Sequence, residues 1–157
     1  MKIVNKVFAY ITFDHRLLVF DQVDFPDEAV QVPAGTRHEN ENPEVAVLRE
    51  AWEETGLADL KMGAFLGETD FMWAGSDTVF RRRFYHLICE GSPGERWRHY
   101  EEHPSEGPAE RILFELYWVD LPGGVPRLSS GHDAFLQQLL RRMNLAPAAD
   151  SGSASAA

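Results

Sequence analysis

The sequence predicts an α/β domain in which helices cover the faces of a mixed β-sheet. Segments rich in β-branched and aromatic residues alternate with two amphipathic helical segments, and several of the strand-like segments follow one another as hairpins. The chain of 157 residues fits one domain, with 44% hydrophobic and 25% charged residues, an ordinary globular balance. Strands that arrive partly as hairpins favour a mixed sheet over a purely parallel one.

The individual elements follow from local composition. Strands are expected at residues 3–13, 17–20, 30–32, 60–66, 80–89 and 112–119. Polar, Gly-rich or Pro-rich loops are expected at residues 21–28, 36–41, 67–78 and 91–110. Residues 133–143 show an apolar stripe at helical spacing and are expected to form a helix. We expect residues 1–145 to form the domain and residues 146–157, rich in Ala and Ser, to be a disordered tail.

The most sharply marked element is a helix at residues 43–55. Asn42 suits the N-cap, and Pro43 suits the first helical position. Glu44 adds negative charge where the helix dipole favours it, and Gly56 is the expected stop. Apolar residues recur at helical spacing and are expected on the buried sides, namely Val45, Leu48 and Trp52, with Ala46, Val47 and Ala51 beside them.

The formal net charge of −10 disfavours a nucleic-acid partner, because phosphate binding usually leaves a basic footprint. It permits a small phosphorylated substrate, since a bound divalent cation can invert the local field. No apolar run approaches the roughly 18 residues of a membrane span, and the N-terminus lacks signal-peptide order, so we expect a soluble cytoplasmic protein with no membrane partner. Cys89 is the only cysteine, which excludes an intrachain disulfide and favours a buried inert thiol.

Three carboxylates on the helix at residues 43–55 converge on one patch. A helix turns about 100° per residue, so Glu50 and Glu54 lie about 40° apart and Glu53 about 60° to the other side. Unpaired, they would repel one another, whereas magnesium binds a few carboxylates together with phosphates and water. Arg49 can hold the Glu53 carboxylate through paired hydrogen bonds. The competing interpretation is a solvated acidic helix face, the commoner meaning of such a run.

The flanking residues overturn that interpretation. Residues 35–57, GTRHENENPEVAVLREAWEETGL, fit the Nudix box GX5EX7REUXEEXGU, in which U is a bulky aliphatic residue. The matches are Gly35, Glu41, Arg49, Glu50, Glu53, Glu54 and Gly56, with Leu57 in the last U position. Ala51 is smaller than the first U asks, and Ala34 stands where a second Gly is usual. Seven fixed matches arise by chance on the order of once in 10⁸ starting points or more rarely. The sequence therefore resembles the MutT-like Nudix hydrolase superfamily.

The resemblance implies an α/β/α sandwich with a mixed sheet. It also implies Mg²⁺-dependent (or Mn²⁺-dependent) cleavage of a diphosphate bond in a nucleoside diphosphate derivative, such as a nucleoside triphosphate, a dinucleotide or a nucleotide sugar. In this family Glu50 and Glu54 would be metal ligands, Glu53 a ligand or the base that acts on water, and the Gly35 carbonyl part of the metal shell. Arg49 would orient a carboxylate, and Glu41 would brace the loop.

The catalytic base varies across the family and is sometimes a Glu outside the box. Glu53 is our first candidate, with Glu106 and Glu110 as alternatives in the long loop. Further glutamates lie nearby in sequence, at Glu101, Glu102 and Glu115. For any one loop Glu, simple solubility is the competing explanation.

The substrate is less clearly marked. Strand alternation sends Arg81 and Arg83 to one face and Arg82 to the other. Because Arg suits phosphate recognition, we take Arg81 and Arg83 as candidate substrate-binding residues, against the alternative of an exposed strand end paired with acids. Aromatic residues that could either stack on a base or pack are Phe71, Trp73 and Trp97, whereas Trp52 and Trp118 are expected to pack. Downstream signatures of the NADH-cleaving, ADP-ribose and diadenosine polyphosphate groups are missing.

Two other functions remain open on the same fold. A catalytically silent nucleotide sensor would have no need for the clustered charges of the box, which argues against it. An isomerase acting on isopentenyl diphosphate would need a reactive cysteine beside the metal, and Cys89 lies in an expected strand. Family members are often dimers, so the resemblance leaves a homodimer open, but nothing in the sequence shows a partner surface.

Overall fold

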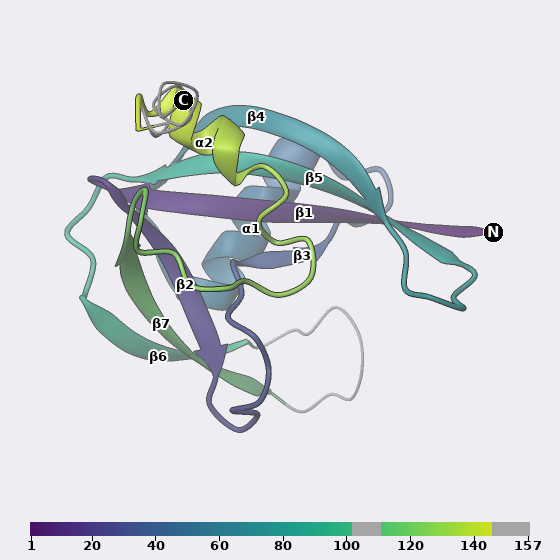
Figure 1. The fold of residues 1–157 in the computed structure, drawn as a ribbon, viewed down its shortest axis with the longest axis horizontal. Coiled ribbons are helices and arrows are strands. Elements are labelled where there is room, and N and C mark those ends of the chain that lie inside the picture. Colours follow the sequence, from purple (N-terminus) through teal and green to yellow (C-terminus); the bar gives the residue numbers. More distant parts are fainter. Residues whose placement is uncertain (102–110, 146–157) are drawn as a thin grey trace, which may run out of the picture.

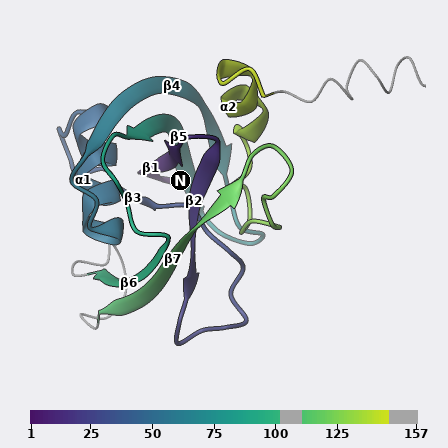
Figure 2. The same ribbon diagram turned by 90° about the vertical axis from the view of Figure 1, so that its left-hand side faces the viewer.

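The computed structural model describes residues 1–101 and 111–145, in which seven strands form one mixed sheet between two helices. The elements in chain order are β1 (Lys2–Phe13), β2 (Arg16–Gln22), β3 (Ala34–Thr36), α1 (Pro43–Thr55), β4 (Leu60–Phe71), β5 (Thr78–Cys89), β6 (Arg96–Glu101), β7 (Ile112–Asp120) and α2 (Leu136–Arg142). Figure 1 shows the sheet face, and Figure 2 shows α1 and α2 on its opposite sides. The predicted α/β/α sandwich is confirmed. The expected tail at residues 146–157 lies outside the described residues.

The central strand β1 organises the sheet, whose order is β4-β5-β1-β2-β7-β6. β1 runs parallel to β5 along nearly its whole length. Its other edge pairs with β2 only at Thr12 and Phe13, because β2 then leaves to pair with β7. That divergence leaves the middle of β1, from Lys6 to Phe8, to pair with β3. The glycine that opens the box is thereby held against the centre of the sheet.

Alternate side chains of β1 pack into two separate hydrophobic cores. Val7 and Ala9 belong to the core that includes the buried residues of α1, whereas Phe8 and Tyr10 belong to the core that includes α2. Residues one position apart in a strand point to opposite faces. Whether a strand residue has an odd or an even position therefore decides which layer of the molecule it meets.

The helix predicted at residues 43–55 is confirmed as α1, with Asn42 Oδ1 accepting from the N–H groups of the first turn and Gly56 in the left-handed conformation (φ 77°). Ala46, Val47 and Ala51 are buried as predicted, whereas the prediction was wrong for Val45 and Trp52. Val45 and Trp52 are each 57% exposed, while small residues and two glutamates face inward. Ala46 and Ala51 let the helix approach the sheet closely, which turns the larger apolar residues outward.

Three strand boundaries differ from the sequence-based prediction. β4 continues to Phe71, because Gly67 takes part in an irregular register with β5 and does not end the strand. A Cβ at Gly67 would overlap the ring of Phe135. The expected strand at residues 30–32 forms only isolated bridges, and β3 begins just after Pro33. The expected loop at residues 91–110 contains the edge strand β6, whose alternation of exposed and inward residues was hidden by flanking Gly and Pro.

The remaining expectations concern α2, membranes and the cysteine. The second helix spans a shorter stretch than predicted, because residues 133–135 form turns before it. No helix in the described parts of the chain is long and apolar enough to cross a bilayer. Cys89 is buried in the core shared with α1, as expected.

Two buried histidines make stability depend on pH. Burial, aided by neighbouring cations, lowers the pKa of His86 and of His132 from 6.5 to about 4. Between these two pH values the unfolded chain binds more protons than the folded chain does. The contribution of each neutral histidine to the free energy of unfolding is therefore complete above about pH 6.5 and is lost as the pH falls toward 4. We expect the free energy of unfolding to drop by at most about 1.4 kcal/mol per pH unit for each group. Urea denaturation at several pH values across this range should show that the free energy of unfolding falls less steeply with pH in His86→Gln than in the parent protein. An equally steep fall in the variant would contradict the prediction.

Candidate active site

Three buried carboxylates gather where α1 meets the end of β6. Glu50 and Glu54 lie one turn apart on α1, and Glu101 is the last residue of β6. They are 3%, 5% and 6% exposed, and one carboxylate oxygen of each lies within 4.8 Å of the others. Ligand oxygens about 2–2.6 Å from one ion are at most about 5 Å apart, so this spacing suits a single hard cation.

Burial and repulsion oppose ionisation of this group. Burial raises the pKa of Glu50 to about 7 despite a hydrogen bond from Arg49. The pKa of Glu54 is raised first by burial and then by the charge of Glu101, with which it shares a hydrogen bond. Oε1 of Glu50 is buried with no hydrogen-bond partner among the described residues. A buried oxygen left unpartnered beside two other carboxylates is what a cation site requires.

Gly35 lies against the Glu50 carboxylate so closely that no larger residue fits. A Cβ at Gly35 would overlap Cδ and Oε1 of Glu50. β3 holds the glycine by pairing it with Val7, and the Ala34 N–H donates to Oε1 of Glu54 at 2.9 Å. Glycine here lets the backbone approach the carboxylates, which its carbonyl must do to join a metal's oxygen shell.

Arg49 holds the carboxylate of Glu50 in place through a network of hydrogen bonds. Its Nε and Nη2 donate to both oxygens of Glu41, at 2.8 and 2.9 Å, and lower the pKa of Glu41 to about 2. Nη1 donates to Glu50 at 2.9 Å and to Glu53 at 3.1 Å, and Nη2 also donates to the Thr36 carbonyl. One guanidinium therefore ties the loop after β3 to α1 and orients the Glu50 carboxylate.

β6 brings Glu101 into the group by docking on the C-terminal end of α1. Trp97 Nε1 donates to the Thr55 carbonyl and His99 Nε2 lies 2.9 Å from the Glu53 carbonyl. These carbonyls belong to the last turn of the helix, where no intrahelical N–H is available. Alternation then directs the next inward residue, Glu101, to the carboxylates. We had named Glu101 only among the outlying glutamates, and the inward alternation of Trp97 and His99 was the signal that could have selected it.

The other candidate bases lie elsewhere or outside the described residues. Glu53, our first candidate, is not in the carboxylate group, and its Oε1 accepts from Arg49. Glu115 forms ion pairs with Arg98 and Arg96, which lower its pKa. Residues 102–110, which hold Glu102, Glu106 and Glu110, lie outside the described residues.

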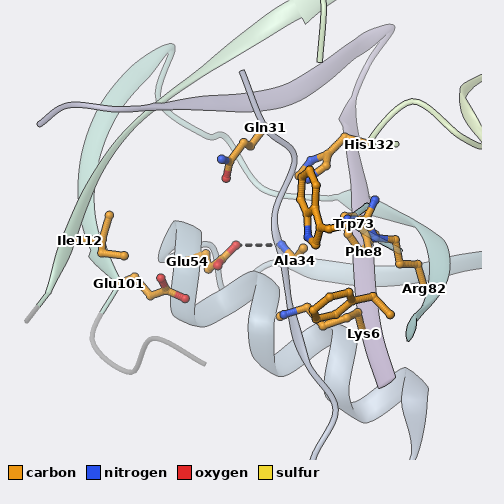
Figure 3. A pocket seen from close by; sticks show the side chains of 12 residues that line it. Lys6, Phe8, Gln31, Ala34, Glu54, Trp73, Arg82, Glu101, Ile112 and His132 are labelled. Atoms are coloured by element: carbon orange, nitrogen blue, oxygen red, sulfur yellow. Dashed lines mark hydrogen bonds between the residues drawn. The ribbon is translucent and has the colours of Figure 1, made fainter. Parts of the chain in front are cut away.

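A cavity of about 300 Å³ opens beside the carboxylates. That volume is at the lower end for small-molecule sites. Glu54 and Glu101 face one end of it, and Figure 3 shows Arg82, Phe8 and His132 on the side away from them. The cavity therefore has an acidic end and a basic, aromatic end.

The arginine run on β5 divides as alternation predicts, but Arg82 is the member that lines the cavity. Arg81 pairs with Asp70 at 2.9 Å, and Arg83 pairs with Glu68 at 3.0 Å, on the face turned toward α1. Arg81 and Arg83 do not line this cavity, and their assignment to substrate binding stays a prediction. The sequence showed which residues share a face but not which face carries the cavity.

A profile of the NUDIX domain matches residues 4–122, which is most of the chain and includes the whole box. The chain belongs to the Nudix family. Its box retains the arginine and all four glutamates of the pattern, and it is a hydrolase of this family. No curated protein sequence matches the chain.

Solved Nudix structures share the fold. A MutT NUDIX hydrolase from Burkholderia pseudomallei is 21% identical with a TM-score of 0.61, over 88% of this chain and 99% of that one. A UDP-X diphosphatase is 15% identical with a TM-score of 0.64, over 92% of this chain and 64% of that one. The Bacillus subtilis pyrophosphohydrolase BsRppH is 20% identical with a TM-score of 0.57, over 89% and 83%. At these identities the likeness concerns the fold.

The donor set fits a hard divalent cation such as Mg²⁺ or Mn²⁺. Three carboxylates at mutual ligand spacing, an unpartnered Glu50 oxygen and a glycine backbone in contact with it provide only oxygen donors. Cys89 does not line the cavity, which leaves the isomerase chemistry without its thiol there.

We expect Mg²⁺ to stabilise the protein through this group. At about 100 times its dissociation constant, a bound ion should raise the melting temperature by about 5–10 °C. Glu54→Gln should abolish the rise, yet leave the metal-free protein at least as stable as the parent, because it removes a buried charge. Differential scanning fluorimetry with and without Mg²⁺ measures both effects.

Glu53→Gln is the matched control for that experiment, since the residue adjoins Glu54 but lies outside the carboxylate group. It should keep most of the metal-induced rise. If Glu53→Gln lost the Mg²⁺-induced rise in melting temperature and Glu101→Gln kept it, Glu53 rather than Glu101 would be the metal ligand.

Proposed function

We propose that the protein is a Mg²⁺-dependent pyrophosphohydrolase that cleaves the diphosphate bond of a nucleoside diphosphate derivative. The observation that carries this proposal is the buried group of Glu50, Glu54 and Glu101 opening onto a cavity with cationic side chains at its other end. The named activities of a UDP-X diphosphatase and a pyrophosphohydrolase among proteins of the same fold support the reaction class.

In this proposal Glu50, Glu54 and Glu101, each through one carboxylate oxygen, and the Gly35 carbonyl would hold the cation. The bound ion would neutralise charge on the diphosphate and make water easier to deprotonate, and the second oxygen of Glu101 would stay available for a proton. Glu101 and Glu54 are the carboxylates that face the cavity, so a water attacking phosphorus lies within reach of them rather than of Glu53. We assign Glu101 the role of accepting that proton, because Glu54 is already held by the Ala34 N–H.

Lys6 provides a positive charge for the diphosphate. Its Nζ donates to Oγ1 of Thr36 at 3.1 Å, beside Gly35, and its side chain lines the cavity. A compact ammonium group with spare donors suits a phosphate oxygen. The metal and Lys6 together would hold the two phosphates in place for attack.

Hydrolysis should be measured with nucleoside triphosphates, dinucleotides and nucleotide sugars, each with Mg²⁺ or Mn²⁺. At least one should yield a nucleoside monophosphate. Glu54→Gln should lower kcat/KM more than about a hundredfold while the circular dichroism spectrum stays unchanged. Full turnover by this variant would remove the metal-ligand assignment, and silence of the parent protein across every substrate would favour a nucleotide sensor.

A further inference from the structure

Arg82 is a buried cation with no acidic partner in residues 1–101 and 111–145. It is 8% exposed, and its guanidinium carbon lies 4.0 Å from the ring centre of Phe71 and 4.9 Å from that of Phe8. Nη1 donates to the Ser130 carbonyl at 2.7 Å, whereas Nε is buried without a partner. Burial alone lowers the pKa of Arg82, with no carboxylate acting against it. Burying an unpaired charge is costly unless a ligand compensates it.

A second cation lies directly beside it. Lys6 of β1 and Arg82 of β5 are register partners on parallel strands, so their side chains share one face of the sheet. Like charges at opposed positions destabilise a sheet. Because Lys6 is assigned to the diphosphate, Arg82 is the member of this pair that is left for another electron-rich group of the substrate.

His132 adds another donor to the same end. The Val32 N–H donates to its Nδ1 at 3.2 Å, so in the neutral ring the hydrogen is on Nε2. The low pKa of His132 keeps the ring neutral at physiological pH. Its ring and that of Phe8 meet in a T-shaped arrangement, at 5.0 Å between ring centres, and it lines the cavity. Arg82 and His132 thus both offer N–H groups and no acceptor.

The walls of this end are aromatic. Phe8, Phe80 and Trp73 line the cavity, and Trp73 is 53% exposed with its ring at an edge-on contact with Phe71 (4.7 Å). Flat apolar walls suit a heterocycle that stacks on them and suit a hydrated phosphate poorly.

We propose that this end of the cavity binds the base of the nucleotide and selects a base with a carbonyl edge, guanine or uracil, over adenine and cytosine. The proposal rests on the proposed function. Arg82 and His132 would donate to O6 and N7 of guanine, or to O4 of uracil. The amino group of adenine or cytosine would face these donors and leave hydrogen bonds unmade. Gln31, with both a donor and an acceptor, does not discriminate.

The direct test is binding of nucleoside monophosphates, which needs no turnover. Isothermal titration of the Mg²⁺-loaded protein with GMP, UMP, AMP and CMP should show at least about tenfold tighter binding of GMP or UMP than of AMP and CMP. The GMP and UMP arms distinguish the two carbonyl bases. Equal affinities, preference for an amino base, or no binding of any of the four would overturn the proposal.

Hydrolysis separates this proposal from the proposed function. kcat/KM should be compared within two sets that differ only in the base, the four nucleoside triphosphates and the four nucleoside diphosphate glucoses. Cleavage without base preference would leave the hydrolase standing and remove the base selection. Absence of cleavage would count against the hydrolase, while the monophosphate titrations would still decide the base selection.

Substitutions assign the selection to Arg82. Arg82→Gln should reduce the ratio of GMP to AMP affinity at least about fivefold, mainly by weakening GMP binding. Arg81→Gln is the matched control, because it removes the neighbouring guanidinium on the other face of the same strand and should leave the ratio unchanged. If Arg82→Gln does not fold, Arg82→Lys keeps the charge without the planar fork and should also lose selectivity. An unchanged ratio in a folded Arg82 variant would contradict the assignment.

Discussion

Three carboxylates share a space from which water is largely excluded, and that constraint explains most of what surrounds them. Glu50, Glu54 and Glu101 repel one another, and within the part of the chain that the structure describes Arg49 donates a hydrogen bond to Glu50. Burial without a further positive charge favours the protonated forms of Glu50 and Glu54, whose pKa values are raised. In the metal-free protein, burial and mutual repulsion of the three carboxylates therefore destabilise the fold, and a bound divalent cation would remove that destabilisation. Folding stability and metal binding are thus coupled at this group.

The surrounding structure holds these oxygens at ligand spacing. The close approach of β3, permitted by glycine, supplies a backbone wall, and Arg49 ties the preceding loop to α1. β6 completes the group from a sheet edge by satisfying carbonyls at the end of α1. The other end of the cavity depends on alternation in β1 and β5, which turns Lys6 and Arg82 to the same face. One sheet thus presents its cations to a cavity whose acids come from a helix and an edge strand.

Local signals were enough to predict some of this and not the rest. α1 could be located from its cap, its first-turn proline and its terminal glycine, because those residues act through neighbouring backbone groups. Alternation along β6 marks Glu101 only as an inward residue, because its role depends on β6 docking on the end of α1, whose contacting residues lie 42 and 46 positions earlier in the chain. Alternation along β5 predicts that Arg82 lies on the opposite face from Arg81 and Arg83. It does not predict which of the two faces borders the cavity, so Arg82 could not be chosen from the sequence. Trp52 was expected to pack, but the inward glutamates rotate the helix so that it is exposed.

The most direct test of the account is anomalous diffraction from crystals grown with Mn²⁺. Data collected at the manganese absorption edge should give a peak bounded by the carboxylate oxygens of Glu50, Glu54 and Glu101, with the Gly35 carbonyl next to it. A peak at another place, or a map without one while the three carboxylates remain hydrogen-bonded to each other, would contradict the claim that this buried group exists to hold a cation.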